Sequence, residues 1–196
     1  MANSLGSELV KAEAEKGAHS KNPDVIDLTM RGWALYWQGL SKPTKDDNDA
    51  VRALFEQALK IDPNDADALA GEAASYDFEH LYFPNPETDY DAKVIGPADR
   101  AIALAPENMR AYRTKSAYLV LSRRFDESLR TADAGLAINA NYASLYGVRS
   151  NAKSSLGQFE QAISDAQQAM RLSPRDPLRL LAIPSGYGTW VRRWVR

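Results

Sequence analysis

The strongest constraint on this sequence is a motif that recurs at a fixed distance. Three similar segments end in Pro106, Ala140 and Pro174, which lie 34 residues apart. A fourth copy ends at Pro63, 43 residues before Pro106, so nine extra residues separate these two copies. The segments read as helices, and a proline that follows them favours a helix end because the residue before proline disfavours helical geometry. A period of this length predicts a chain of stacked helical hairpins.

Small residues recur at one place in the four segments and predict close helix packing there. These residues are Ala58, Ala101, Gly135 and Ala169. The wider gaps are expected to hold aromatic residues such as Phe125 and Phe159, which follow a turn in the last two copies. The chain also contains 30 alanines, the residue with the highest intrinsic helix propensity. The pattern therefore predicts an all-α fold.

In these features the sequence resembles the tetratricopeptide repeat (TPR) family over about three-quarters of its length, roughly Asp24 to Pro174. The resemblance implies a right-handed superhelical α-solenoid of about four hairpins. The expected repeats span about 23–65, 66–108, 109–142 and 143–176. They follow an N-terminal helix and connection in residues 1–22 and precede a capping or tail segment in residues 177–196.

The second repeat departs from the family pattern. It carries an insertion around residues 84–88, and Gly96-Pro97 falls inside its expected second helix. Proline removes a backbone donor and clashes with the preceding turn, so we expect a kink or a late start of that helix.

The resemblance implies a concave groove that is lined by the first helix of each hairpin and holds a peptide. The groove positions expected to bind the peptide are Trp33, Tyr36, Trp37, Asp77, Phe78, Arg110, Arg113, Ala117, Leu121, Asn151 and Ser154. Trp33 and Trp37 can serve as apolar anchors, or they can pack against the N-terminal helix or the insertion. Arg110 and Arg113 can bind carboxylates bidentately, or they can form solvated surface or internal ion pairs.

Some members of the family clamp the C-terminal carboxylate of a chaperone. Arg113 and Asn151 occupy comparable groove positions, but Ala117 and Val148 stand where polar residues are required. The pattern therefore argues against such a clamp.

Charge is unevenly distributed, although the whole chain has 24 basic and 26 acidic residues. Nine acids and no Lys or Arg lie between Asp62 and Asp91, whereas six arginines and one acid lie between Arg171 and Arg196. The acidic block either attracts a basic partner or forms solvated helix faces. Its first residues lack the glycine and distal glutamate of a calcium loop.

The C-terminus is basic and apolar. Trp190, Arg192, Arg193 and Trp194 lie in a short segment that is expected to cap the stack or to pack between molecules. The alternatives are a contact with an anionic membrane, which the pattern favours less, and a disordered or truncated end.

Several chemistries are excluded by composition. The chain has no cysteine, and its two histidines, His19 and His80, lie far apart. It therefore offers no thiolate zinc site, no disulfide and no recognisable catalytic triad, and we expect no cofactor and no metal. A near-neutral total charge gives no reason to expect nucleic acid. Neither a secretory signal nor an apolar run long enough to span a membrane is evident, so we expect a cytoplasmic protein.

These observations predict a non-catalytic scaffold that binds a protein or peptide. Two alternatives remain. The chain can be a module for homo-oligomeric assembly through its C-terminal segment, or it can be part of an enzyme whose catalytic domain is absent from this chain.

A narrower resemblance concerns residues 13–32 and 169–177. Both segments resemble the TPR region attached to bacterial class III adenylate/guanylate cyclases. This resemblance implies that the chain is the interaction region of a bacterial signalling protein.

Overall fold

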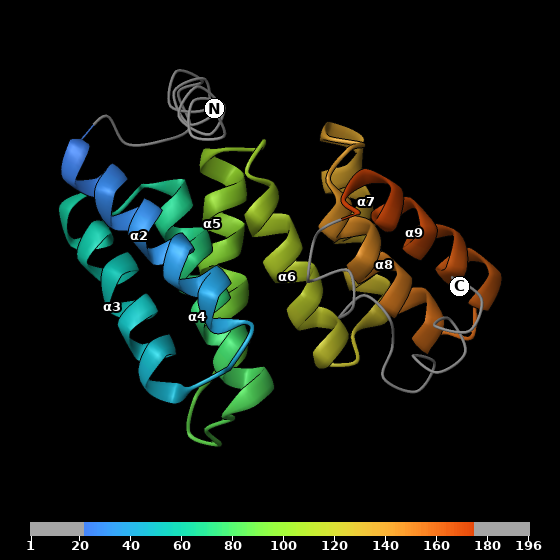
Figure 1. The fold of residues 1–196 in the computed structure, drawn as a ribbon, viewed down its shortest axis with the longest axis horizontal. Coiled ribbons are helices and arrows are strands. Elements are labelled where there is room, and N and C mark those ends of the chain that lie inside the picture. The colour runs from blue at the N-terminus through green and yellow to red at the C-terminus, as the bar shows by residue number, and fades with distance from the viewer. Residues whose placement is uncertain (1–21, 175–196) are drawn as a thin grey trace. The chain divides into compact units, whose positions relative to one another are not determined.

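The computed structural model describes residues 22–174, and all regular structure in that range is helical. The helices are α2 (Pro23–Gly39), α3 (Lys45–Ile61), α4 (Ala66–Tyr82), α5 (Gly96–Leu104), α6 (Met109–Leu121), α7 (Phe125–Ile138), α8 (Ala143–Ser155) and α9 (Phe159–Leu172), with a π-helical segment, η1 (Asp91–Ile95), directly before α5 (Figure 1). The all-α class predicted from the repeat is confirmed for these residues. The expected N-terminal helix and C-terminal capping segment lie outside them.

Short polar side chains define where three of the first helices begin. Asn22, Asp65 and Asn108 precede α2, α4 and α6, and each accepts a hydrogen bond from a backbone N–H two or three residues on, at 2.7–3.1 Å. Such caps satisfy backbone donors that have no partner within the helix. Asn108 also donates to the carbonyl of Ala66 at 3.2 Å, which ties the start of α6 to the start of α4.

The chain divides into two compact units between Ala111 and Tyr112, inside α6. We call residues 22–111 the first unit and residues 112–174 the second unit. In the first unit α3 packs against α2 and α4, α4 packs against η1 and α5, and α2 also contacts α4. In the second unit α8 packs against α7 and α9.

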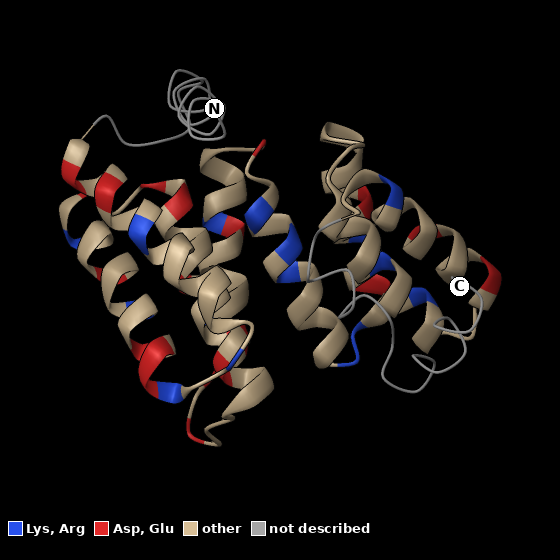
Figure 2. Ribbon diagram, viewed as in Figure 1, with Lys and Arg blue, Asp and Glu red and all other residues tan. Residues whose placement is uncertain are grey.

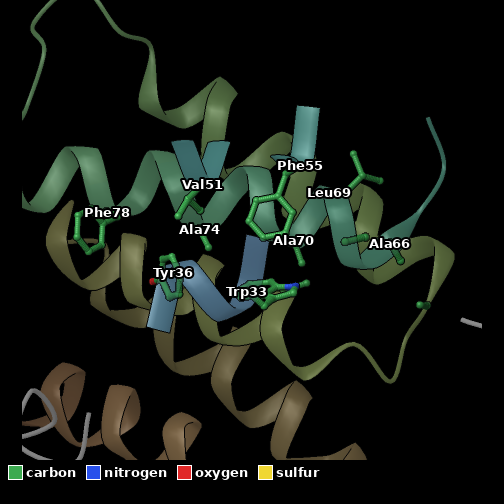
Figure 3. Packing of buried hydrophobic residues seen from close by; sticks show 12 residues of the cluster. Trp33, Tyr36, Val51, Phe55, Ala66, Leu69, Ala70, Ala74 and Phe78 are labelled. Carbon is green, nitrogen blue, oxygen red and sulfur yellow. The ribbon is translucent and has the colours of Figure 1, made fainter. Parts of the chain in front are cut away.

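The core of the first unit centres on the ring of Phe55, which is fully buried (Figure 3). This ring lies against two glycines, Gly32 of α2 and Gly71 of α4. A Cβ atom at Gly32 would lie 2.8 Å from the ring, and one at Gly71 would overlap it. The two glycines therefore create the space into which α3 inserts its aromatic side chain.

The nine extra residues of the second repeat are divided between a helix and a connection. Helix α4 has 17 residues where α8 has 13, and residues 83–90 replace a connection of only three residues, 156–158. The expected distortion near Pro97 takes the form of the π-helical turn η1, directly before α5. A π-turn bonds residue i to i+5 and is a recognised way to accommodate a break in the α-helical ladder.

The turns inside the last two hairpins use a left-handed residue. Gly157 has φ +77°, and Arg123 has φ +61° at the same place in the third repeat. The next N–H in each turn bonds back across the helix end, from Gln158 to the Lys153 carbonyl at 2.9 Å and from Arg124 to the Leu119 carbonyl at 2.8 Å. This is the Schellman arrangement, which glycine adopts without strain.

Candidate functional site

The predicted groove residues of the first unit are mostly buried. Trp33 is 5% exposed, and Tyr36 and Phe78 are buried beside it. The Trp33 ring lies 5.2 Å from that of Phe55, and the Tyr36 ring lies 6.0 Å from that of Phe78, both in edge-on geometry (Figure 3). These three rings therefore fill the space between α2, α3 and α4, and Trp33 lies in the core of the first unit.

Trp37 differs from its neighbour. It is 37% exposed, and its ring stacks on that of Trp33 at 6.3 Å with an interplanar angle of 28°. A buried tryptophan thus stacks against one that is partly exposed at the surface.

Arg110 makes an internal ion pair. One of its guanidinium nitrogens donates to both carboxylate oxygens of Asp67, at 2.9 and 3.0 Å, and the guanidinium carbon lies 4.9 Å from the centre of the Trp33 ring. The arginine is about one-third exposed. Asp77, the remaining groove residue of this unit, is buried.

The groove positions of the second unit are more accessible. Arg113, Ala117, Asn151 and Ser154 are half-buried, and Leu121 is 38% exposed. We call these five residues the α6–α8 face, after the two helices that carry them.

Gly135 of α7 brings α6 and α8 together. A Cβ atom at this glycine would lie 2.6 Å from a Leu145 methyl of α8 and 3.0 Å from Tyr112 of α6. One turn further along α6, the hydroxyls of Ser116 and Ser128 of α7 lie 2.9 Å apart, and each serine also donates to the other's carbonyl. Small side chains thus fix the separation of the helices that carry the α6–α8 face.

The acidic block between Asp62 and Asp91 is partly used inside the first unit. Asp65 caps α4, Asp67 binds Arg110, and the buried carboxylate of Glu79 binds Arg52. Glu79 also accepts a hydrogen bond from the Tyr90 hydroxyl at 3.0 Å. Several of these acids are therefore neither a binding patch nor solvated helix faces.

Burial changes the titration of three groups near this network. It raises the pKa of the Tyr90 hydroxyl and of the Glu72 carboxyl. It lowers the pKa of His80, whose ring lies 4.7 Å from that of Tyr90. Each shift favours the uncharged form, as expected for groups withdrawn from water.

An ion cluster that was not predicted from the sequence joins three helices of the second unit. Arg149 of α8 binds Asp165 of α9 through two nitrogens at 2.6 and 2.8 Å, and it binds Asp133 of α7 at 2.7 Å. Lys153 also binds Asp165, at 2.8 Å. The hydrogen bond with Asp165 is the main reason that the pKa of Arg149 is raised. The sequence feature that could have predicted it is a basic residue on the buried side of one helix, Arg149, followed by an acid on the buried side of the next helix, Asp165.

The two units carry opposite formal charge. Residues 22–111 hold 17 Asp and Glu against eight Lys and Arg, a charge of −9 (Figure 2). Residues 112–174 hold five against eight, a charge of +3. The near-neutral total therefore conceals two surfaces suited to different partners.

Residues 22–174 contain no group of three or more His, Asp or Glu side chains that could hold a metal ion. No helix in this range is long and apolar enough to cross a membrane. The proposed contacts at Trp190, Arg192, Arg193 and Trp194 lie outside the described residues.

Comparison with known proteins agrees with this architecture. Residues 143–176 match the tetratricopeptide repeat family model. A thermophilic TPR protein from Thermus thermophilus has a similar structure, with a TM-score of 0.67 and 22% identity, over 86% of this chain and 84% of that one. The structure of Pseudomonas aeruginosa pilF gives a TM-score of 0.58 at 18% identity, over 85% of this chain and 72% of that one. The predicted resemblance to TPR solenoids is confirmed at the level of the fold.

Two curated relatives are much longer than this chain, and their sequences match it over only part of their own length. The chain is 26% identical over 174 residues to the "DnaJ homolog subfamily C member 7 homolog" of Schizosaccharomyces pombe, and 27% identical over 139 residues to the "Protein STIP1 homolog" of Dictyostelium discoideum. These matches cover 83% and 71% of this chain. They span only 35% and 20% of the two relatives.

Proposed function

We propose that this chain is a non-catalytic scaffold that binds a protein or peptide, with the α6–α8 face as its contact surface. The observation that supports this proposal is the difference between the units. The groove positions of the first unit are mostly filled by its own side chains, whereas those of the second remain partly exposed. Similarity of the fold to TPR proteins supports the same class of function.

The chemistry of the α6–α8 face favours a ligand with both polar and apolar groups. Arg113 offers a guanidinium, Asn151 and Ser154 offer amide and hydroxyl groups, and Leu121 offers an exposed apolar side chain. The second unit is also basic, which favours an acidic ligand. We do not propose a chaperone-tail clamp, because Ala117 and Val148 interrupt the required polar pattern.

The proposal is tested by capture from a lysate of the source cells followed by quantitative mass spectrometry. The double variant Arg113→Glu with Asn151→Ala is expected to lose proteins that the wild-type chain retains. Each such protein is then purified and titrated against both forms. The matched control is Arg130→Glu, the same charge change at an exposed residue of α7. Retention of the same proteins by wild type and the double variant would exclude the α6–α8 face.

The other functions expected from the sequence remain hypotheses. A role as the interaction region of a bacterial cyclase-type signalling protein, and a cytoplasmic location, are supported by the residue pattern alone. Self-assembly through the C-terminal segment is tested by light scattering of the chain with Trp190 and Trp194 changed to alanine. An unchanged oligomeric mass would remove that alternative. Turnover that disappears after one acidic substitution would favour the enzyme alternative.

A further inference from the structure

A second candidate surface lies at one end of the first unit, where α2 and α4 terminate. Apolar side chains gather there because Tyr36 near the end of α2 contacts Phe78 near the end of α4, at a ring distance of 6.0 Å. We call the accessible residues of this end the apolar rim. They are Trp37, Leu40, Leu81, Tyr82 and Phe83.

The apolar rim is continuous with the core beneath it. Leu40, Tyr82 and Phe83 are partly buried and pack against the cluster that contains Tyr36 and Phe78. The Tyr82 ring lies 4.7 Å from that of Phe78. Trp37 and Leu81 are the most exposed members, at 37% and 46%. Tryptophan and tyrosine are enriched among the residues that contribute most to binding between proteins.

Carboxylates outnumber cations at this end. The connection after α2 leads to Asp46, Asp47 and Asp49 at the start of α3, and the connection after α4 carries Glu87 and Asp89 (Figure 2). The basic residues in the same stretches are Lys42 and Lys45. Because α3 runs antiparallel to α2, its start lies beside the end of α2.

Part of this negative charge is not neutralised internally. Asp49 pairs with Lys45 at 2.6 Å. By contrast, within residues 22–174 the exposed carboxylates of Asp46 and Glu87 form no ion pair. The first unit as a whole carries −9.

We propose that the apolar rim docks a basic amphipathic segment of another protein, with Trp37 as the main apolar contact. Leucine-like side chains of the partner would cover the rim, and its lysines or arginines would face the surrounding carboxylates. Charge complementarity selects this partner over an acidic one, because like charges across an interface are costly. The inference rests on the proposed function in that the chain binds proteins, but it uses a surface separate from the α6–α8 face.

The test uses the full chain and two fluorescent peptides of about 18 residues, in which leucine recurs at helical spacing. Lysine fills the other positions in one peptide, and glutamate fills them in the other. Fluorescence anisotropy is expected to show binding of the lysine peptide and at least about tenfold weaker binding of the glutamate peptide. Trp37→Ala is expected to weaken binding of the lysine peptide by about tenfold or more.

The contribution of the surrounding carboxylates to peptide binding is tested with a separate pair of variants. Asp46→Asn with Glu87→Gln is expected to weaken binding of the lysine peptide by about threefold and to reduce its salt dependence. The matched control is Asp24→Asn with Glu107→Gln, which removes two exposed acids at the opposite end of the unit. The control is expected to bind with a clearly smaller loss.

Three outcomes would overturn the proposal. The first is equal binding of the two peptides, and the second is a loss with the control pair as large as that with the rim pair. The third is self-association of the wild-type chain in light scattering that Trp37→Ala abolishes, because the occupant would then be a second copy. Arg113→Glu is expected to leave the affinity for the lysine peptide unreduced. Failure of the proposal for the α6–α8 face can therefore be distinguished from failure of the proposal for the apolar rim.

Discussion

The substitution Gly71→Ala tests whether the two glycines around Phe55 are required for packing. Alanine in place of glycine inside a helix normally stabilises by about 1 kcal/mol. Here the added Cβ atom would overlap the Phe55 ring, which has no solvent exposure and packs within the buried core of the first unit. Overpacking of a filled core costs about 1–3 kcal/mol, and expelling a buried phenylalanine ring costs about as much.

The overlap at Gly71 is closer than at Gly32, so we take the upper part of that range and expect a net loss of about 2 kcal/mol. The assay is urea denaturation followed by circular dichroism. Gly39→Ala is the matched control, because Gly39 is also helical but has no atom within 4 Å of its added Cβ. That variant is expected to be neutral or slightly stabilised.

A double-mutant cycle separates the clash from other effects. Phe55→Leu shortens the side chain, so it is expected to be less harmful in the Gly71→Ala background than in wild type, by about 1 kcal/mol. A Gly71→Ala protein as stable as wild type would refute the reasoning. So would strictly additive effects of the two substitutions.

Three further predictions concern other residues. Trp33→Ala is expected to lower the free energy of unfolding by about 3–5 kcal/mol, because Trp33 is buried. Trp37→Ala is expected to lower it by only about 1 kcal/mol, because Trp37 is partly exposed. Equal losses in urea denaturation would contradict this difference in burial. Asp165→Asn leaves two cations without their buried carboxylate and is expected to cost about 3 kcal/mol, against less than about 1 kcal/mol for Asp133→Asn, whose side chain is exposed. His80 has a lowered pKa in the folded protein, so the unfolded chain binds its proton more readily and stability falls as the pH drops below about 6.5, the ordinary value. His80→Phe is expected to show a smaller loss of stability than wild type between about pH 7 and 5.5, and parallel curves would disprove this contribution.

The hairpin order was predictable because its signals are local. Prolines and short polar caps act on the backbone within a few residues, and the small residues recur with the repeat. The form of the distortion at Pro97 was not predictable in the same way. A kink and a late start can each accommodate the backbone N–H that proline lacks, and the π-helical turn η1 directly follows the inserted connection, residues 83–90.

The roles of individual site residues depend on distant partners. Trp33 and Trp37 lie four apart on one helix, but the first packs against Phe55 of another helix and is buried, whereas the second is partly exposed. The acidic block looked like surface because its cations come from elsewhere in the chain. Asp67 binds a residue 43 positions away, and Glu79 binds one 27 positions away. No local pattern contains such pairings.

The Arg149 cluster has a consequence for how the second unit opens. In a stack of repeats each hairpin contacts only its neighbours, so a terminal hairpin can unfold while the rest stays folded. Here one guanidinium binds carboxylates from α7 and α9 while its own backbone belongs to α8. Separating α8 and α9 from α7 therefore exposes a cation that was shared among three helices. Backbone amides of α7, α8 and α9 should accordingly exchange with solvent through one common opening rather than in sequence from the end.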